Sequence, residues 1–262
     1  NNMKSKKLKK WTTLLTCATA LTVMTACSQS SSQSTGTSTS SKTSAVTATT
    51  SKKTNKNNSN YFTSKDSDTS YNESSATKIK LSGSSADVSG DGAVLSGSTV
   101  TISKAGTYVI SGKSDGVQIK VDAGDSDDVH IVLDGVTMTN TNAAINATKA
   151  GHVYLTLKDG TTNTLSDSSS NSDQDADAVI FSKGDLTING SGTLNIDAKK
   201  NNGIKANDSL HMTGGTYKIS SVGDAFNVND ELNITGTTMT IEAEEDAVKV
   251  DNDDDTSVGT MY

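Results

Sequence analysis

A repeat of about 22 residues in the second half of the chain constrains the fold more than any other feature. Three related phrases follow one another: GDLTINGSGTLNI (184–196), DSLHMTGGTYKI (208–219) and DELNITGTTMTI (230–241). After each comes a short apolar segment, NGIKA, DAFNV or DAVKV, and DAVIF (177–181) is an earlier copy. Alternating apolar and polar residues within these pieces indicate short strands. A nearly constant step between the pieces is typical of a solenoid, in which each repeat packs on its neighbours.

The repeat therefore predicts an all-β fold, a parallel β-helix with about 22 residues per coil. Recurring leucines support this period, because Leu186, Leu210 and Leu232 follow one another at spacings of 24 and 22 residues. Coils of this kind are filled by small and medium aliphatic side chains, in agreement with an aromatic content of 4%. An antiparallel sandwich also has many short strands, but it does not require the same phrase at a constant step.

The first 77 residues have a different composition. With Met3 as initiator, five lysines precede the apolar stretch WTTLLTCATALTVM. This pattern is typical of a signal peptide, residues 1–26, and the stretch is short for a membrane span. Cys27 is the expected lipidation site of a bacterial lipoprotein, with an ordinary secretory signal as the alternative. Residues 27–77, rich in Ser, Thr, Lys and Asn, are expected to form a disordered linker before a domain over 78–262.

These features predict an exported protein that is held by a lipid anchor at the outer face of the bacterial cell membrane. Removal of the signal would take away five of the 23 lysines and leave 18 lysines against 30 acidic residues. Nucleic-acid binding is not expected, because it requires clustered cations. We expect a monomer whose contact with the membrane is the lipid anchor alone.

Stacking of equivalent positions would place oxygen-bearing side chains at the turn before each short strand, about 5 Å apart. Carboxylates at this spacing repel one another unless a cation neutralises them. Ca²⁺ takes six to eight oxygen ligands, so the pattern predicts a calcium site. The alternative is turn chemistry alone, because Asp and Asn favour turns. Turn chemistry accounts for the residue at Asn202 and is an open alternative for Asp177. The best-placed calcium ligands are Asp177, Asp224, Asp246, Asp251 and Asp253.

Several phrases closely resemble a known family: GTTNTLSD, DLTINGSGTLNI, NNGIKANDSL, TGGTYKI and DAVKVDNDDD. The family consists of bacterial, often clostridial, carbohydrate-binding domain-containing proteins that bind cellulose and pectin-like acidic sugars. The resemblance covers about residues 78–262. It implies a right-handed parallel β-helix similar to that of pectate lyases, calcium among the turn aspartates and a polysaccharide partner. Because such domains usually continue through further coils, we expect a copy that is truncated after Tyr262.

The residues favour a non-catalytic binder over an enzyme, and no catalytic residue is assigned. A calcium-dependent polysaccharide lyase would need a base, and since the chain has no arginine, Lys205, Lys218 and Lys249 are the formal candidates. A lysine base needs a depressed pKa, which the carboxylates around Lys249 oppose. A surface scaffold or adhesin with a protein partner is a further alternative, because one fold serves many functions.

Histidines and aromatic residues do not define a binding face. His130, His152 and His211 are scattered along the sequence and are expected to lie on strand surfaces without a metal. Tyr217 and Phe226 could serve as stacking platforms for sugars, but we expect them to fill corners between strands. The binding face is therefore left unassigned.

Overall fold

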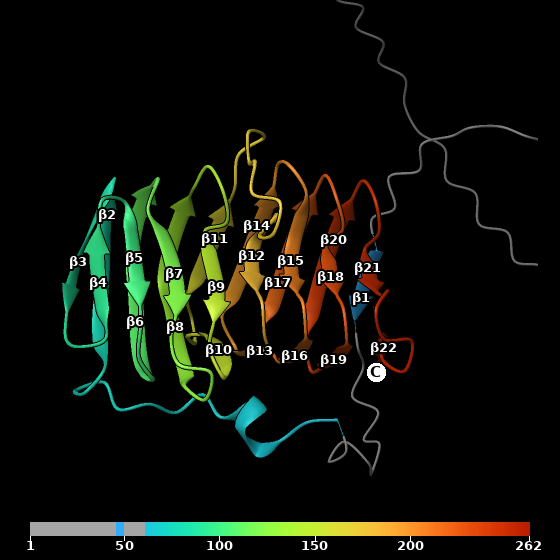
Figure 1. Cartoon of the computed structure of the whole chain (residues 1–262), viewed down its shortest axis with the longest axis horizontal. Helices are drawn as coiled ribbons and strands as arrows, with labels where there is room; N and C mark the ends of the chain where they lie inside the picture. The colour runs from blue at the N-terminus through green and yellow to red at the C-terminus, as the bar shows by residue number, and fades with distance from the viewer. Residues whose placement is uncertain (1–45, 50–60) are drawn as a thin grey trace, which may run out of the picture. The chain divides into compact units, whose positions relative to one another are not determined.

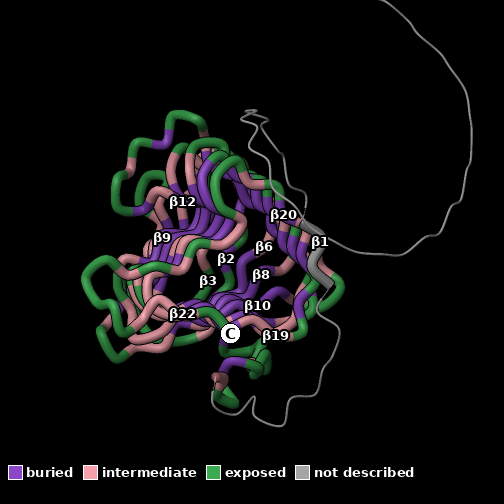
Figure 2. Tube along the Cα trace, turned by 90° about the vertical axis from the view of Figure 1, so that its right-hand side faces the viewer, coloured by how far each residue is buried: buried purple, intermediate pink, exposed green. Residues whose placement is uncertain are grey.

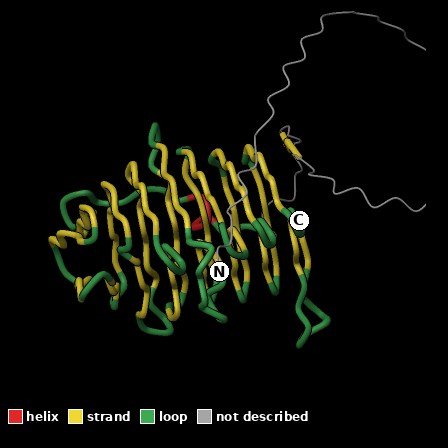
Figure 3. The backbone as a smooth tube through the Cα atoms, turned by 90° about the horizontal axis from the view of Figure 1, so that it is seen from above, coloured by secondary structure: helices red, strands yellow, loops and turns green. Residues whose placement is uncertain are grey.

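The computed structural model describes residues 46–49 and 61–262, which are mostly β-strands (Figures 1 and 3). They belong to one compact unit, Lys42–Tyr262. The predicted signal peptide, Cys27 and most of the predicted linker lie outside the described residues. Within the described part of the chain, no helix has the length and apolar character needed to cross a membrane.

Two sheets make up this unit. The larger has 14 strands: β1 (Val46–Thr49), β2 (Thr77–Gly83), β3 (Ser85–Ser89), β6 (Gly106–Asp115), β8 (Asp128–Thr139), β10 (His152–Leu157), β11 (Thr162–Ser166), β13 (Leu186–Gly190), β14 (Thr193–Ala198), β16 (Ser209–Thr213), β17 (Thr216–Ser221), β19 (Glu231–Thr235), β20 (Thr238–Ala243) and β22 (Thr260–Met261). The smaller has eight: β4 (Ala93–Ser96), β5 (Thr99–Ile102), β7 (Gln118–Asp122), β9 (Ile145–Lys149), β12 (Ala178–Ser182), β15 (Asn202–Ala206), β18 (Phe226–Val228) and β21 (Val248–Val250).

The larger sheet has two limbs that meet at β8. Residues 128–133 of β8 pair with β10, and residues 137–139 pair with β11. One limb continues from β10 through β13 and β16 to β19, and we call these four strands the strapped limb. The other continues from β11 through β14 and β17 to β20, and we call these four strands the open limb.

The prediction of a right-handed parallel β-helix with a regular coil is wrong for this chain. The strands form two mixed sheets, because β2 with β3, β4 with β5, and β1 with β20 pair antiparallel. The long strands β6 and β8, of 10 and 12 residues, continue around the bend and join two rows of strands into one sheet. The number of residues between paired positions also varies. Val153 pairs with Leu186, 33 positions later, whereas Leu210 pairs with Leu232, 22 positions later. The 22-residue repeat therefore describes local stacking of the last strands and not the whole fold.

The interior is aliphatic, as the alternating sequence pattern predicts. Parallel register places Leu186, Leu210 and Leu232 side by side, and all three are buried. Phe226 and Tyr217 are 0% and 1% exposed, so both pack inside and neither is a stacking platform for sugars. Figure 2 shows that buried residues recur along the strands of the molecule.

Glycines make the bend between the two limbs. Gly190 is the last residue of β13, and Gly214 and Gly236 directly follow β16 and β19. Their φ values are +96°, +81° and +65°. L side chains rarely adopt this conformation. A Cβ on Gly190 would also overlap the carbonyl oxygen of Leu157. The glycines of the repeated phrases thus turn the chain from the strapped limb into the open limb.

Residues 61–75, which we call the strap, run along the outer face of the strapped limb (Figures 1 and 2). The strap contains a 3-10 helix, η2 (Ser64–Ser67), with Thr63 at its N-cap and a capping box to Asp66. The predicted linker boundary at residue 77 therefore needs correction. Residues 61–75 belong to the folded domain. Asp66 within them is 1% exposed and accepts a hydrogen bond from Thr187 of the sheet.

Candidate functional site

The open limb presents rows of hydroxyl, amide and charged side chains to solvent. In each strand these side chains alternate with buried ones such as Leu194 and Ile219, because successive residues point to opposite faces of a sheet. The parallel register aligns the outward residues in three rows: Thr162, Thr193, Thr216 and Thr238; Thr164, Asn195, Lys218 and Thr240; Ser166, Asp197, Ser220 and Glu242. Except for Ser166, which is buried, these residues are exposed or half-buried, so the result is a polar face largely open to solvent.

An open hollow lies in the middle of this face and is lined by Thr164, Asn195, Ile196, Asp197, Lys218 and Ser220. Lys218 is exposed and makes no ion pair among the described residues. Asn195 donates to the Thr164 hydroxyl over a long 3.4 Å, so its amide is weakly engaged. The hollow therefore offers the Lys218 ammonium, the Asn195 amide, two hydroxyls and the carboxylate of Asp197 as hydrogen-bonding partners for a ligand.

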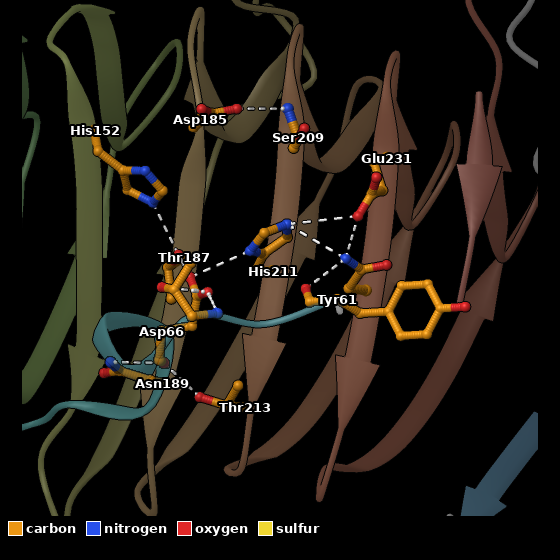
Figure 4. A network of polar contacts seen from close by, with 12 residues as sticks. Tyr61, Asp66, His152, Asp185, Thr187, Asn189, Ser209, His211, Thr213 and Glu231 are labelled. Carbon is orange, nitrogen blue, oxygen red and sulfur yellow. Dashed lines mark hydrogen bonds and ion pairs between the residues drawn. The ribbon is translucent and has the colours of Figure 1, made fainter. Parts of the chain in front are cut away.

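The outer face of the strapped limb is equally polar, but the strap covers it. Thr187, Asn189 and Asn233 are each 0% exposed. Thr187 and Asn189 nevertheless point toward the strap (Figure 4), and Asn233 hydrogen-bonds to it. Asn189 donates to the carbonyl oxygens of Asp66 and Asp68 at 3.2 and 3.0 Å. Asn233 donates to the carbonyl oxygen of Tyr61 at 2.8 Å. The burial of this polar face therefore depends on the strap.

Asp66 is the centre of this contact (Figure 4). Its Oδ2 accepts from the backbone N–H and hydroxyl of Thr63 at 2.7 and 2.9 Å, within the strap. Its Oδ1 faces the sheet, where it accepts from the Thr187 hydroxyl at 2.6 Å and lies 3.2 Å from Nδ1 of His211. Burial by itself raises the pKa of Asp66, but the hydrogen bonds from Thr187 and Thr63 outweigh it and lower the pKa below 3.8. The carboxylate is thus held in its charged form.

The three histidines, which sequence analysis treats as scattered, lie on the face that the strap covers, which extends from the strapped limb onto the adjoining part of β8. His130 hydrogen-bonds Thr156 at 2.7 Å, and His152 hydrogen-bonds Thr187 at 2.8 Å. Burial lowers the pKa of His130 and His152 below 6.5, and the carboxylates near His152 only partly oppose this. Parallel stacking brings the histidines together because β8, β10 and β16 belong to the same row of strands.

Acidification is expected to weaken the strap in two stages. The folded-state pKa values of His130 and His152 are below 6.5, so the opened state binds protons first and closure loses stability as the pH falls below 6.5. The pKa of Asp66 is also lowered, so its contribution, present above pH 3.8, disappears as the pH falls through the folded-state value. Amide hydrogen exchange of residues 61–75 at pH 7.5, 5.5, 4 and 2.5 measures the opening free energy through both stages. A constant opening free energy over this range would contradict the prediction.

Two predicted calcium ligands belong to a hydrogen-bonded column at the start of the smaller sheet's strands. Asn202 Oδ1 accepts from the N–H of Asp224 at 3.0 Å, and Asp224 Oδ1 accepts from the N–H of Asp246 at 3.1 Å. Asp224 Oδ2 accepts from the Asn227 amide at 2.8 Å. Asp224 is 4% exposed and Asp246 is exposed. Both carboxylate oxygens of Asp224 therefore already accept hydrogen bonds from groups of the protein.

Asp177 lies outside this column, contrary to the sequence alignment of the repeats. Ala178 is in register with Asn202, so the copy at 177–181 is displaced by one residue. The Asp177 carboxylate instead pairs with Lys205 at 2.6 Å and accepts from the Asn201 amide at 2.5 Å. Asp177 and Asp224 are thus not brought together as stacked equivalents.

Asp251 and Asp253 are exposed in the loop after β21. Between them, Asn252 donates to Asp230 at 2.6 Å and accepts from the N–H groups of Asp254 and Asp255. Over residues 46–49 and 61–262, no group of three or more His, Cys, Asp or Glu is arranged to hold a metal. The calcium site stays a prediction.

The architecture and the exposed polar rows can now be set beside known proteins. A solved structure, the gadolinium derivative of the polysaccharide lyase-like protein from C. thermocellum, is similar with a TM-score of 0.56 and 25% identity, over 66% of this chain and 93% of that one. The fold is thus all-β and polysaccharide lyase-like, which agrees with the correction of the regular β-helix. A family model described as carbohydrate-binding domain-containing protein matches residues 96–262. The chain belongs to this family.

A relative within the family is the carbohydrate-binding domain-containing protein of Acetivibrio thermocellus. It is 37% identical over 137 residues, which are 50% of this chain and 48% of the relative. The chain thus spans about half the length of this relative. The matched region of the family model, 96–262, contains both limbs of the larger sheet.

Sequence analysis missed Asp66 and its partners on the strapped limb. The signal was present but weak: Phe62 and Tyr71 are aromatic residues in a segment otherwise rich in small polar residues. In the structure Phe62 packs edge-on against His211, with ring centroids 5.7 Å apart, and Tyr71 does the same against His130 at 6.0 Å. Aromatic residues in such a segment indicate docking on the domain.

Proposed function

We propose that this protein binds a polysaccharide along the outer face of the open limb and does not cleave it. The observation that carries this proposal is the set of three polar rows around the hollow at Asn195 and Lys218. Adjacent strands are about 4.8 Å apart, which is of the same order as one sugar unit in an extended glycan. Successive strands can therefore present hydrogen-bonding groups to successive sugars.

The side chains of this face can bind both the acidic sugars of a pectin-like chain and the neutral sugars of cellulose. Lys218 would pair with a uronate carboxylate, whereas hydroxyl and amide groups serve either polymer. Membership of the carbohydrate-binding domain-containing family supports the class of ligand. We further propose, from the sequence, that the chain is exported and lipidated at Cys27, and that Ca²⁺ assists binding of acidic polymers.

Replacing Asn195 and Lys218 together with alanine is expected to weaken binding about 10–100-fold, because a hydrogen bond to a charged group is worth about 1.5–3 kcal/mol and 1.4 kcal/mol is tenfold. Depletion isotherms on insoluble cellulose and on pectate gel measure this effect. Lys80→Ala is the matched control, because Lys80 is an exposed lysine on β2.

The isotherms, together with an assay for released sugars, separate four outcomes. Retention of the parent with loss in the double variant supports the open limb as the binding face. Undiminished retention of the double variant would place the site elsewhere. Absence of retention by a folded parent would refute polysaccharide binding, and release of unsaturated sugars from pectate would favour a lyase.

A further inference from the structure

The face under the strap has an unusual composition for a permanently buried surface. Covered sheet faces are normally apolar, because burial of a polar group costs free energy unless it is hydrogen-bonded. Here Thr156, Thr187, Asn189 and Asn233 are at most 3% exposed. These side chains hydrogen-bond either one another or the strap, as Thr156 does with Asn189 at 2.6 Å. The composition is that of a surface suited to a polar ligand.

Over β13, β16 and β19 the hydrogen bonds between strap and sheet run in one direction, whereas at β8 Lys65 of the strap donates to Asp128. Every hydrogen bond that crosses this contact from Thr187, Asn189, Thr213 and Asn233 is donated by the sheet and accepted by an oxygen of the strap (Figure 4). The strapped limb therefore presents an array of donors. Such an array suits an anionic ligand that is rich in acceptor oxygens.

The strap does not satisfy this face completely. Asn233 Oδ1 is buried and has no hydrogen-bond partner among the described residues. A buried acceptor without a partner costs free energy. The apolar part of the contact consists of ring contacts and one small cluster. Phe62 and Tyr71 lie against two histidines, Tyr61 stacks on Tyr262, and Tyr71 also packs on a cluster with Val109 and Val132. A cover held mainly by polar contacts opens more easily than an apolar one, since water replaces its hydrogen bonds.

We propose that the outer face of the strapped limb is a second ligand site, for the carboxylate of an acidic sugar, and that Asp66 occupies it as an internal competitor. Asp66 Oδ1, between the Thr187 hydroxyl and His211 Nδ1, marks the position of the ligand carboxylate. The ligand class rests on the proposed function, since an acidic glycan is expected only if the chain binds polysaccharide. The site differs from the open limb in strands and residues.

The test uses the full chain and trigalacturonate as the probe, with cellotriose as the neutral counterpart, in titration calorimetry. Asp66→Ala removes the competing carboxylate and leaves Thr187 and His211 in place. We expect it to bind trigalacturonate at least about tenfold more tightly than the parent, with no gain for cellotriose. Asp68→Ala is the control, because its exposed carboxylate accepts only from Ser70 among the described residues.

A second variant separates a vacated site from a merely loosened strap. Thr187→Val in the Asp66→Ala background keeps the shape of the side chain and removes the hydroxyl donor, so the gain in affinity is expected to disappear. Opening of the strap is followed independently by tryptic cleavage after Lys65, which is exposed. A gain that survives Thr187→Val would overturn the assignment of the site.

Unchanged affinity for trigalacturonate in Asp66→Ala, and also in Asp66→Ala with Phe62→Ala to free the strap, would overturn the proposal. This failure is distinguishable from failure of the proposed function. Retention of the parent on polysaccharide, and its loss in the Asn195 and Lys218 variant, concern the open limb alone. The proposed site under the strap can therefore be refuted while the proposed site on the open limb is upheld.

Discussion

Replacing Phe226 with alanine is expected to lower the free energy of unfolding by about 3–5 kcal/mol, the usual cost of deleting a buried aromatic side chain. Phe226 is 0% exposed and lies in register between Ile204 of β15 and Val248 of β21. Its loss leaves a cavity between stacked strands. Neighbouring backbones cannot close this cavity, because hydrogen bonds to both adjacent strands hold them about 4.8 Å apart.

Urea unfolding followed by circular dichroism measures the change for Phe226. Val94→Ala is the control, because Val94 is 65% exposed and its truncation is expected to change stability by no more than about 0.5 kcal/mol. A loss below about 1 kcal/mol for Phe226→Ala would mean that the stack collapses around the site and that β18 is not rigidly held.

Replacing Asp224 with alanine is expected to cost about 1–3 kcal/mol, because the N–H of Asp246 and the amide of Asn227 both lose their acceptor. Asp224→Asn is expected to keep most of this stability. Asn202 shows why, since its amide oxygen already holds the N–H of Asp224 in the same way. Thermal unfolding of both variants, without added calcium, measures the difference. Equal losses in both variants would show that the negative charge, and not the hydrogen bond, supports the column.

The same pair of variants tests the proposed calcium ion. A ligand that binds only the folded state raises the melting temperature, so calcium at this column predicts a higher Tm with CaCl₂ than with chelator. Asp224→Asn would then lose this increase while it keeps the basal stability. A parent protein whose Tm is the same in calcium and in chelator would contradict a calcium site.

Much of the local structure follows from the sequence. Period-two alternation predicts strands such as β14 and β17, and the repeat predicts that Leu210 and Leu232 occupy equivalent positions, as their pairing confirms. These predictions succeed because alternation and spacing are properties of neighbouring residues and of successive repeats. The same reasoning fails at Asp177, where a one-residue displacement between strands is invisible in the sequence.

The sequence by itself determined that short strands recur through the second half of the chain and that their leucines stack, because alternation and spacing can be read from neighbouring residues and successive repeats. Only the tertiary structure decided that two rows of strands merge into one sheet at β6 and β8, since that depends on whether a long strand continues through a bend. Only the tertiary structure brought Asp66 to His211 and Thr187. Their contacts join residues more than 120 positions apart, and no local pattern specifies such a pairing.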